Sequence, residues 1–165
     1  FSSGKEIITL NHEAFDRTLY SDGALIAANS VGSPFMPGTK CPWAWPYEVN
    51  NEFGGERPPK NYKYAHPQDT KLNFLNRAGQ NTVIGVVAID ANLTQNQLKR
   101  IAIMAQDGIA MAVQPSHTPL DGDTIFAVST GHKSCDNPTI LSELGSAAAR
   151  CVARSLTRAV YEGSK

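Results

Sequence analysis

Residues 81–90 read Asn-Thr-Val-Ile-Gly-Val-Val-Ala-Ile-Asp, a polar dipeptide followed by a long apolar run. The run is rich in β-branched residues, which favours a buried β-strand over residues 82–89. Cleavage of the Asn81-Thr82 bond would leave Thr82 with a hydroxyl nucleophile and a free α-amine, whose pKa of about 8 suits a general base. On these residues alone, the junction is either an ordinary boundary between a loop and a strand or a site of self-cleavage before Thr82.

A regular alternation of helix and strand follows this first strand. Thr94 and Gln97 have the spacing of a capping box, which predicts a helix directly after Thr94. A second strand is expected over residues 124–130, and the dipeptide Asn137-Pro138 is typical of the start of a second helix. The predicted buried stripes of the two helices are Leu98, Ile101, Ala102, Ala105, Ile109 and Ala112, and then Leu141, Leu144, Ala148, Cys151, Ser155 and Ala159. Three arginines are predicted on the opposite, solvated face of the last helix: Arg150, Arg154 and Arg158.

The part of the chain before Asn81 is less regular. Two strands are expected over residues 6–10 and 23–28, and a loop rich in Gly, Pro and Trp follows them. Residues 56–80 are polar and carry three prolines, which predicts an exposed connector. Within the loop, Trp43, Trp45 and Tyr47 either wall an apolar binding cleft or pack against the rest of the loop layer.

Composition restricts the classes of function. The 165 residues include 15 basic and 15 acidic side chains, a balance that gives no electrostatic signal for nucleic acid or an anionic membrane. No apolar run approaches the roughly 20 residues of a membrane-spanning helix. Three widely spaced cysteines predict neither a disulfide framework nor a zinc site and favour a reducing, cytoplasmic setting. The Asp121-Gly122-Asp123 motif lacks the rest of a calcium loop, so it is interpreted as a tight turn before a strand. We therefore expect no metal and no organic cofactor.

Several of these motifs together resemble one family of hydrolases. They are the Asn81-to-Asp90 stretch, Gln106-Asp107-Gly108-Ile109-Ala110, the run His117-Thr118-Pro119-Leu120-Asp121-Gly122-Asp123-Thr124, and upstream Gly23 to Asn29 and Trp43 to Gly55. This pattern resembles the self-processing N-terminal-nucleophile aminopeptidases, which comprise the D-aminopeptidase DmpA and the β-peptidyl aminopeptidases and include the nylon-oligomer (6-aminohexanoate-oligomer) endo-hydrolases. The Asn-Thr junction and the Asp-Gly-Asp turn resemble the nylon-oligomer branch most.

The resemblance implies an α/β fold, a four-layer α/β/β/α sandwich of the N-terminal-nucleophile-hydrolase type. It also implies roles for single residues. Thr82 matches the nucleophile, Asn29 matches an asparagine whose amide faces the developing oxyanion, and Asp121 and Asp123 match acidic residues near the nucleophile. For Asn29, the alternative is a buried strand-end asparagine satisfied by backbone groups. Relatives also carry a long segment before the position of Phe1, including a lysine that contacts the nucleophile. Lys5 is too close to Asn29 in sequence to match that lysine, so the role is not transferred to it.

These expectations divide the chain into residues 1–81, the end of a large (α) subunit, and residues 82–165, a small (β) subunit that begins at the nucleophile. The function expected first is hydrolysis of linear amide oligomers of the 6-aminohexanoate type through a threonine acyl-enzyme. A D-amino-acid or β-peptidyl aminopeptidase is the next alternative, and an unprocessed, non-catalytic assembly domain is another. Expected partners are a linear amide or peptide substrate, the upstream portion of the same enzyme, and further copies in a homo-oligomer of paired subunits.

Overall fold

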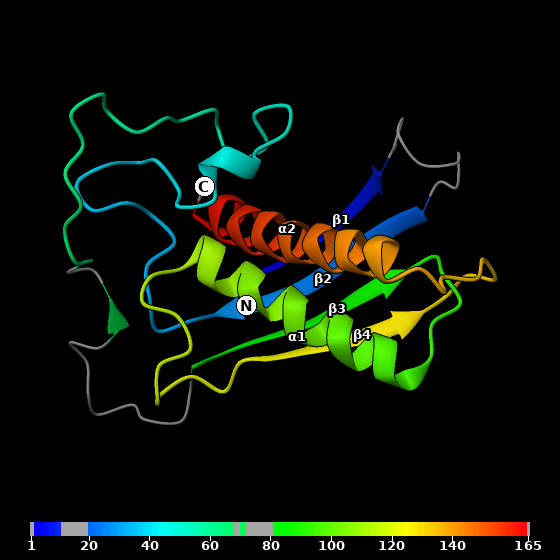
Figure 1. Ribbon diagram of the computed structural model, residues 1–165. Coiled ribbons are helices and arrows are strands. Elements are labelled where there is room, and N and C mark those ends of the chain that lie inside the picture. Colours follow the sequence, from blue (N-terminus) through cyan, green and yellow to red (C-terminus); the bar gives the residue numbers. More distant parts are fainter. Residues whose placement is uncertain (1, 11–19, 68–69, 72–80, 165) are drawn as a thin grey trace.

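The fold consists of a β-sheet with helices packed on one face (Figure 1). The computed structural model describes residues 2–10, 20–67, 70–71 and 81–164. Within these residues the elements are the strands and helices β1 (Ser2–Leu10), β2 (Tyr20–Asn29), η1 (Trp45–Tyr47), β3 (Thr82–Ile89), α1 (Gln95–Ala112), β4 (Thr124–Ser129) and α2 (Pro138–Gly163). The predicted strands and helices are confirmed. Of the predicted connector, residues 68–69 and 72–80 lie outside the described residues.

The sheet has the strand order β1-β2-β3-β4. The pairs β1-β2 and β2-β3 are antiparallel, whereas β3 and β4 are parallel and are connected through α1. Because β2 and β3 are antiparallel, the end of β2 and the start of β3 lie at the same edge of the sheet. Both helices contact this sheet from the same side, where α2 lies over β1 and β2 and α1 lies nearer β4 (Figure 1).

Local sequence signals explain where the helices begin. The Thr94 hydroxyl accepts a hydrogen bond from the backbone of Gln97, whose side chain accepts one from the backbone N–H of Thr94. The Asn137 side chain caps α2 by accepting from the N–H of Thr139 at 2.8 Å. Where the two helices cross, Gly108 allows close contact, because a Cβ at this position would lie 2.2 Å from the carbonyl oxygen of Ala149.

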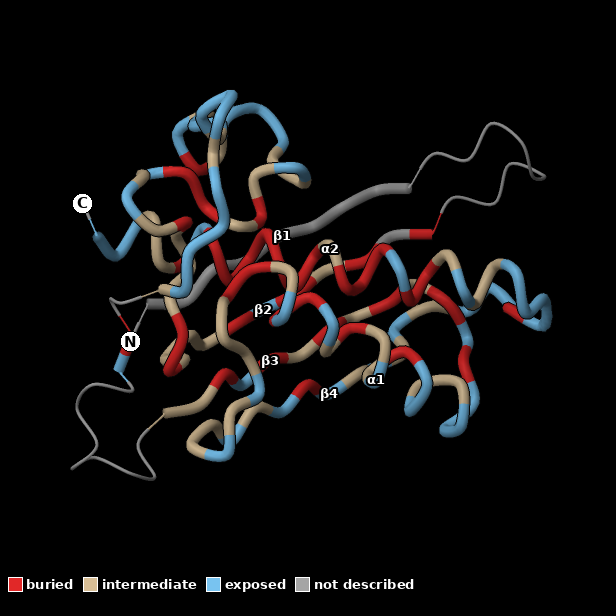
Figure 2. The backbone as a smooth tube through the Cα atoms, turned by 60° about the vertical axis from the view of Figure 1, so that its left-hand side comes forward, coloured by how far each residue is buried: buried red, intermediate tan, exposed pale blue. Residues whose placement is uncertain are grey.

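The hydrophobic core lies between the helices and the sheet, and most of the predicted buried stripes are part of it. Figure 2 shows buried residues along α2 and along the central strands. The other face of the sheet differs, since its large apolar side chains are exposed: Leu25 (49%), Ile84 (48%), Phe126 (59%) and Val128 (40%). Alternate residues on the same strands are buried, such as Ile26 and Val87 at 0%. Within the described residues, the chain therefore supplies one helical layer and one sheet, with one sheet face covered.

One prediction about α2 is wrong. Arg154 does not lie on a solvated face but is buried, and its guanidinium donates to both carboxylate oxygens of Glu52 at 2.6 and 3.1 Å. The reason is that the segment after η1 folds over the outer side of α2, so that residues 151–157 are buried all around the helix. Arg158 is exposed, as expected for a solvated face, and Arg150 is half-buried. No helix in the described part of the chain has the length and hydropathy to span a membrane.

Candidate active site

The residues expected to act as the nucleophile and as the oxyanion donor are direct neighbours. Thr82 is the first residue of β3 and pairs with Asn29, the last residue of β2. Both are half-buried. The antiparallel register therefore places a hydroxyl and a side-chain amide side by side at one edge of the sheet, although the two residues are far apart in sequence.

The turn before β4 contacts Thr82 and the residue before it. The Thr82 hydroxyl donates to the carbonyl oxygen of Gly122 at 2.5 Å. The backbone N–H of Gly122 donates to the carbonyl oxygen of Asn81 at 3.1 Å. The peptide bond expected to break is thus in contact with the Asp-Gly-Asp turn on both sides.

Asp121 and Asp123 lie beside Thr82, and both carboxylates accept hydrogen bonds from the neighbouring backbone. Asp121 accepts from the N–H of Val31 at 3.0 Å and from the N–H and hydroxyl of Thr118 at 3.1 and 2.7 Å. Asp123 accepts from the N–H of Val83 at 2.9 Å. Asp121 therefore fixes the loop that follows Asn29, while Asp123 fixes the start of β3. The Thr82 hydroxyl itself donates to a backbone carbonyl rather than to either carboxylate.

Asp123 has a second partner, which is His117. The Nδ1 atom of His117 lies 2.8 Å from Asp123 Oδ2, and His117 adopts a φ of 52°. A positive φ is uncommon for a residue with a side chain. The imidazole contacts the same carboxylate that accepts from the N–H of Val83 at the start of β3. The described residues contain no group of three or more His, Cys, Asp or Glu side chains suited to a metal ion.

Lys71 is a site residue that the sequence did not indicate. Its Nζ atom donates to Asn29 Oδ1 at 2.5 Å, and its backbone N–H donates to the carbonyl of Val31 at 3.0 Å. Desolvation lowers the pKa of the Lys71 ammonium, and the negative charge of Asp121 opposes this change. Lys71 lies in the polar connector, which has no periodic pattern, so no local signal distinguishes it from the other lysines there. Lys5 lies midway along the edge strand β1, where it pairs with Leu25, whereas Asn29 lies at the end of β2.

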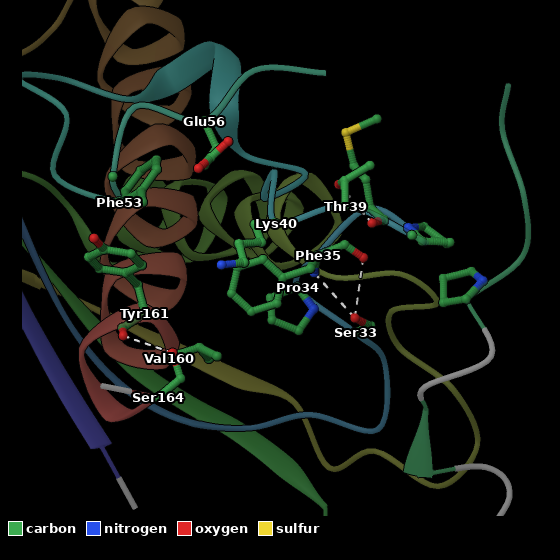
Figure 3. A pocket seen from close by; sticks show the side chains of 15 residues that line it. Ser33, Pro34, Phe35, Thr39, Lys40, Phe53, Glu56, Val160, Tyr161 and Ser164 are labelled. Carbon is green, nitrogen blue, oxygen red and sulfur yellow. Dashed lines mark hydrogen bonds between the residues drawn. The ribbon is translucent and has the colours of Figure 1, made fainter. Parts of the chain in front are cut away.

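Trp43, Trp45 and Tyr47 pack against other residues and do not line the cavity beside the end of α2. The Trp43 ring lies 6.0 Å from that of Tyr64, and the Arg57 guanidinium lies 5.8 Å from the Trp45 ring. Tyr47 packs against the core. The cavity, of about 880 Å³, lies between residues 33–40, residues 53–56 and the end of α2 (Figure 3). Its walls include Phe35, Lys40, Phe53, Glu56 and Tyr161, and within the described part of the chain neither Thr82 nor Asn29 lines it.

Comparison with known proteins gives an aminopeptidase and an oligomer endohydrolase among the sequence relatives. An uncharacterised aminopeptidase of Mycobacterium leprae is 38% identical over 149 residues, which are 84% of this chain and 40% of that protein. A 6-aminohexanoate-oligomer endohydrolase of Kocuria sp. is 30% identical over 69 residues, which are 42% of this chain and 19% of that protein.

Two solved structures share the fold. One is the L-aminopeptidase D-Ala-esterase/amidase of Ochrobactrum anthropi, described as a new variant of the Ntn-hydrolase fold (TM-score 0.56, 20% identity, 96% of this chain and 39% of that chain). The other is a β-aminopeptidase of Burkholderia sp. (TM-score 0.55, 20% identity, 96% of this chain and 41% of that chain). The fold is therefore of the N-terminal-nucleophile-hydrolase type, as expected.

The chain spans about two fifths of the length of the first of these relatives and of the two structures. The model of peptidase family S58 matches residues 10–165, which is nearly all of the chain. Together with the shared fold, this match shows that the chain belongs to peptidase family S58.

Proposed function

We propose that the chain is part of a self-processing amide hydrolase in which Thr82 becomes the nucleophile. The observation that carries the proposal is the direct pairing of Thr82 with Asn29 at the sheet edge, beside the Asp-Gly-Asp turn, in a chain of this peptidase family. A hydroxyl, a side-chain amide and a possible α-amine at one place are the groups that acyl transfer requires.

The first reaction in the proposal is cleavage of the chain's own Asn81-Thr82 bond. The Thr82 hydroxyl attacks the Asn81 carbonyl carbon, the C–N bond breaks, and the hydroxyl proton ends on the leaving nitrogen. Water then hydrolyses the resulting ester, which returns the hydroxyl and leaves Thr82 with a free α-amine. Within this chain, the cut separates residues 1–81 from residues 82–165.

In turnover, the Thr82 hydroxyl attacks a substrate amide, and the α-amine carries the hydroxyl proton to the leaving nitrogen. Water then hydrolyses the ester of the acyl-enzyme, which frees the acid product and restores the hydroxyl. The Nδ2 group of Asn29 donates to the oxyanion, because Lys71 already occupies the Oδ1 end of that amide. Loss of one oxyanion donor typically lowers turnover about a hundred- to a thousandfold. Asp121 and Asp123 act mainly by holding the segments around Asn29 and Thr82, and their negative charge favours the ammonium form of the new terminus.

The proposed substrate class is linear amide oligomers of the 6-aminohexanoate type. The Asn-Thr junction, the Asp-Gly-Asp turn and the partial match to the Kocuria endohydrolase support this choice. The Ochrobactrum and Burkholderia structures support the alternative, a D-amino-acid or β-peptidyl aminopeptidase.

The uncovered sheet face supports a proposal about partners. Leu25, Ile84, Phe126 and Val128 present apolar side chains that a second layer would bury. We expect the upstream portion of the same enzyme to supply this layer, with paired copies forming a homo-oligomer.

The test uses the longest natural form of the protein that contains this chain. Intact-mass measurement should show cleavage before Thr82, and Thr82→Ala should abolish it while Asn81→Ala should not. Cleavage of Thr82→Ala would indicate that Asn81 breaks the bond by cyclising, and an uncut wild-type protein would favour a non-catalytic assembly domain. Assays of 6-aminohexanoate oligomers beside a D-alanyl amide and a β-alanyl amide would then identify the substrate class.

A further inference from the structure

The backbone of one residue, Gly122, contacts both the peptide bond before Thr82 and the Thr82 hydroxyl. Gly122 donates its N–H to the Asn81 carbonyl oxygen at 3.1 Å, and its own carbonyl accepts the Thr82 hydroxyl at 2.5 Å. One contact is therefore on the electrophile of the proposed cleavage and the other is on the nucleophile.

The register of the sheet explains this arrangement. Each residue of β3 that pairs with β4 has its partner forty positions later, such as Ile84 with Thr124. The isolated bridge between Asn81 and Asp121 keeps the same offset. The parallel ladder thus continues beyond the ends of both strands and across the peptide bond, so its next hydrogen bond falls on the carbonyl that the hydroxyl would attack.

The glycine at this position is explained by space rather than by backbone conformation. A Cβ at residue 122 would lie 3.3 Å from the Thr82 Oγ atom and 3.7 Å from its Cβ. The first distance is tighter than ordinary van der Waals contact. The positive-φ glycines among the described residues are Gly38, Gly54 and Gly55, and Gly122 is not one of them. A larger side chain would therefore press on the nucleophile itself.

We infer that the backbone N–H of Gly122 is the oxyanion donor for self-cleavage of the Asn81-Thr82 bond. The inference deepens the proposed function and rests on it. As the Thr82 oxygen bonds to the Asn81 carbon, negative charge develops on the Asn81 oxygen, where the Gly122 N–H already points. The C–N bond then breaks, and the nitrogen receives the hydroxyl proton. The Gly122 carbonyl orients the hydroxyl before attack. The processing donor is thus a backbone group of the turn, in addition to the Asn29 amide proposed for turnover.

Replacement of single backbone N–H groups by ester oxygens tests the inference. In the full-length protein, glycolic acid in place of Gly122 removes this N–H and adds no side chain. The matched control places leucic acid at Leu120, whose N–H donates to the Thr118 hydroxyl in the same turn. Intact mass followed over time gives the first-order rate of cleavage before Thr82, and it separates this cut from hydrolysis of the introduced ester.

We expect the Gly122 ester to slow cleavage about a hundredfold or more, in the range for one lost oxyanion donor, and the Leu120 ester to change the rate only a few-fold. Equal rates for the two esters would overturn the inference and leave the proposed function intact. A wild-type protein that stays uncut would overturn both.

A second measurement does not depend on the ester variants folding. In the uncut Thr82→Ala protein, a scalar coupling across the hydrogen bond between the Gly122 amide nitrogen and the Asn81 carbonyl carbon should be detectable by NMR, and the Gly122 amide should exchange slowly. Absence of the coupling together with fast exchange of this amide would contradict the inference even if cleavage itself is observed.

Discussion

Asp22 should make the stability of the protein fall as the pH rises. This carboxyl lies in β2 under α2 and is 1% exposed, and neither of its oxygens has a hydrogen-bond partner in the described structure. Burial raises the pKa of Asp22 from its ordinary value of 3.8 to about 7, and the positive charge of Arg150 only partly opposes this change. The protonated form is therefore the one that the folded state accommodates.

The magnitude follows from proton linkage. Below pH 3.8 the carboxyl is protonated in both states and contributes no penalty. Between pH 3.8 and about 7 the unfolded state releases the proton while the folded state keeps it, so the free energy of unfolding decreases. The pKa of Asp22 differs by about 3 between the two states, and each pKa unit is worth 1.36 kcal/mol. The free energy of unfolding is therefore lower by about 4 kcal/mol once the pH exceeds the pKa of the folded state. About 3 kcal/mol of this loss falls between pH 5 and pH 8.

Urea unfolding at intervals from pH 5 to pH 8 measures this effect. Asp22→Asn cannot ionise, so its stability relative to the wild type should rise by about 3 kcal/mol across that range. Asp107→Asn, which removes an exposed carboxylate from α1, controls for the loss of one negative charge. If the wild type and Asp22→Asn show the same dependence on pH, the reasoning from burial is refuted.

Three further changes test the helix crossing, the site and the buried ion pair. Gly108→Ala should destabilise the protein by about 3 kcal/mol, measured by thermal unfolding, because its methyl group would collide with the Ala149 carbonyl; an unchanged melting temperature would contradict this. Lys71→Met should lower kcat about tenfold or more with little change in KM, because the Asn29 amide loses a charged donor. Lys71→Arg should restore part of the activity. A change in KM alone would argue against a role of Lys71 in positioning Asn29. Arg154→Met should cost about 3 kcal/mol in urea unfolding by leaving a mostly buried carboxylate unpaired, and neutralising that carboxylate as well should recover part of the loss. A double variant no more stable than the single one would refute the last point.

Much of the secondary structure could be predicted from the sequence. The apolar run before Asp90 forms β3, the Thr94 and Gln97 pair caps α1, and Asn137 caps α2. Each of these signals acts over a few residues, through hydrogen bonds or periodicity within one element, so it can be recognised without knowledge of the fold. The prediction failed at Arg154, because periodicity along a helix does not reveal a distant loop that covers its outer face.

For the candidate site, too, the sequence indicated single residues, whereas only the tertiary structure showed how they contact one another. Local pattern indicated Thr82 as the start of a strand and the bond before it as a candidate cleavage site, and family resemblance added Asn29, Asp121 and Asp123 as candidate site residues. Three contacts depend on the register of the strands and on loops that meet from distant parts of the chain: the pairing of Thr82 with Asn29, the contact of Lys71 with that asparagine, and the hydrogen bond from Gly122 to the Asn81 carbonyl. Such contacts exist only once the core between helices and sheet has set the strands in place, which is why folding, and no local signal, brings these groups together.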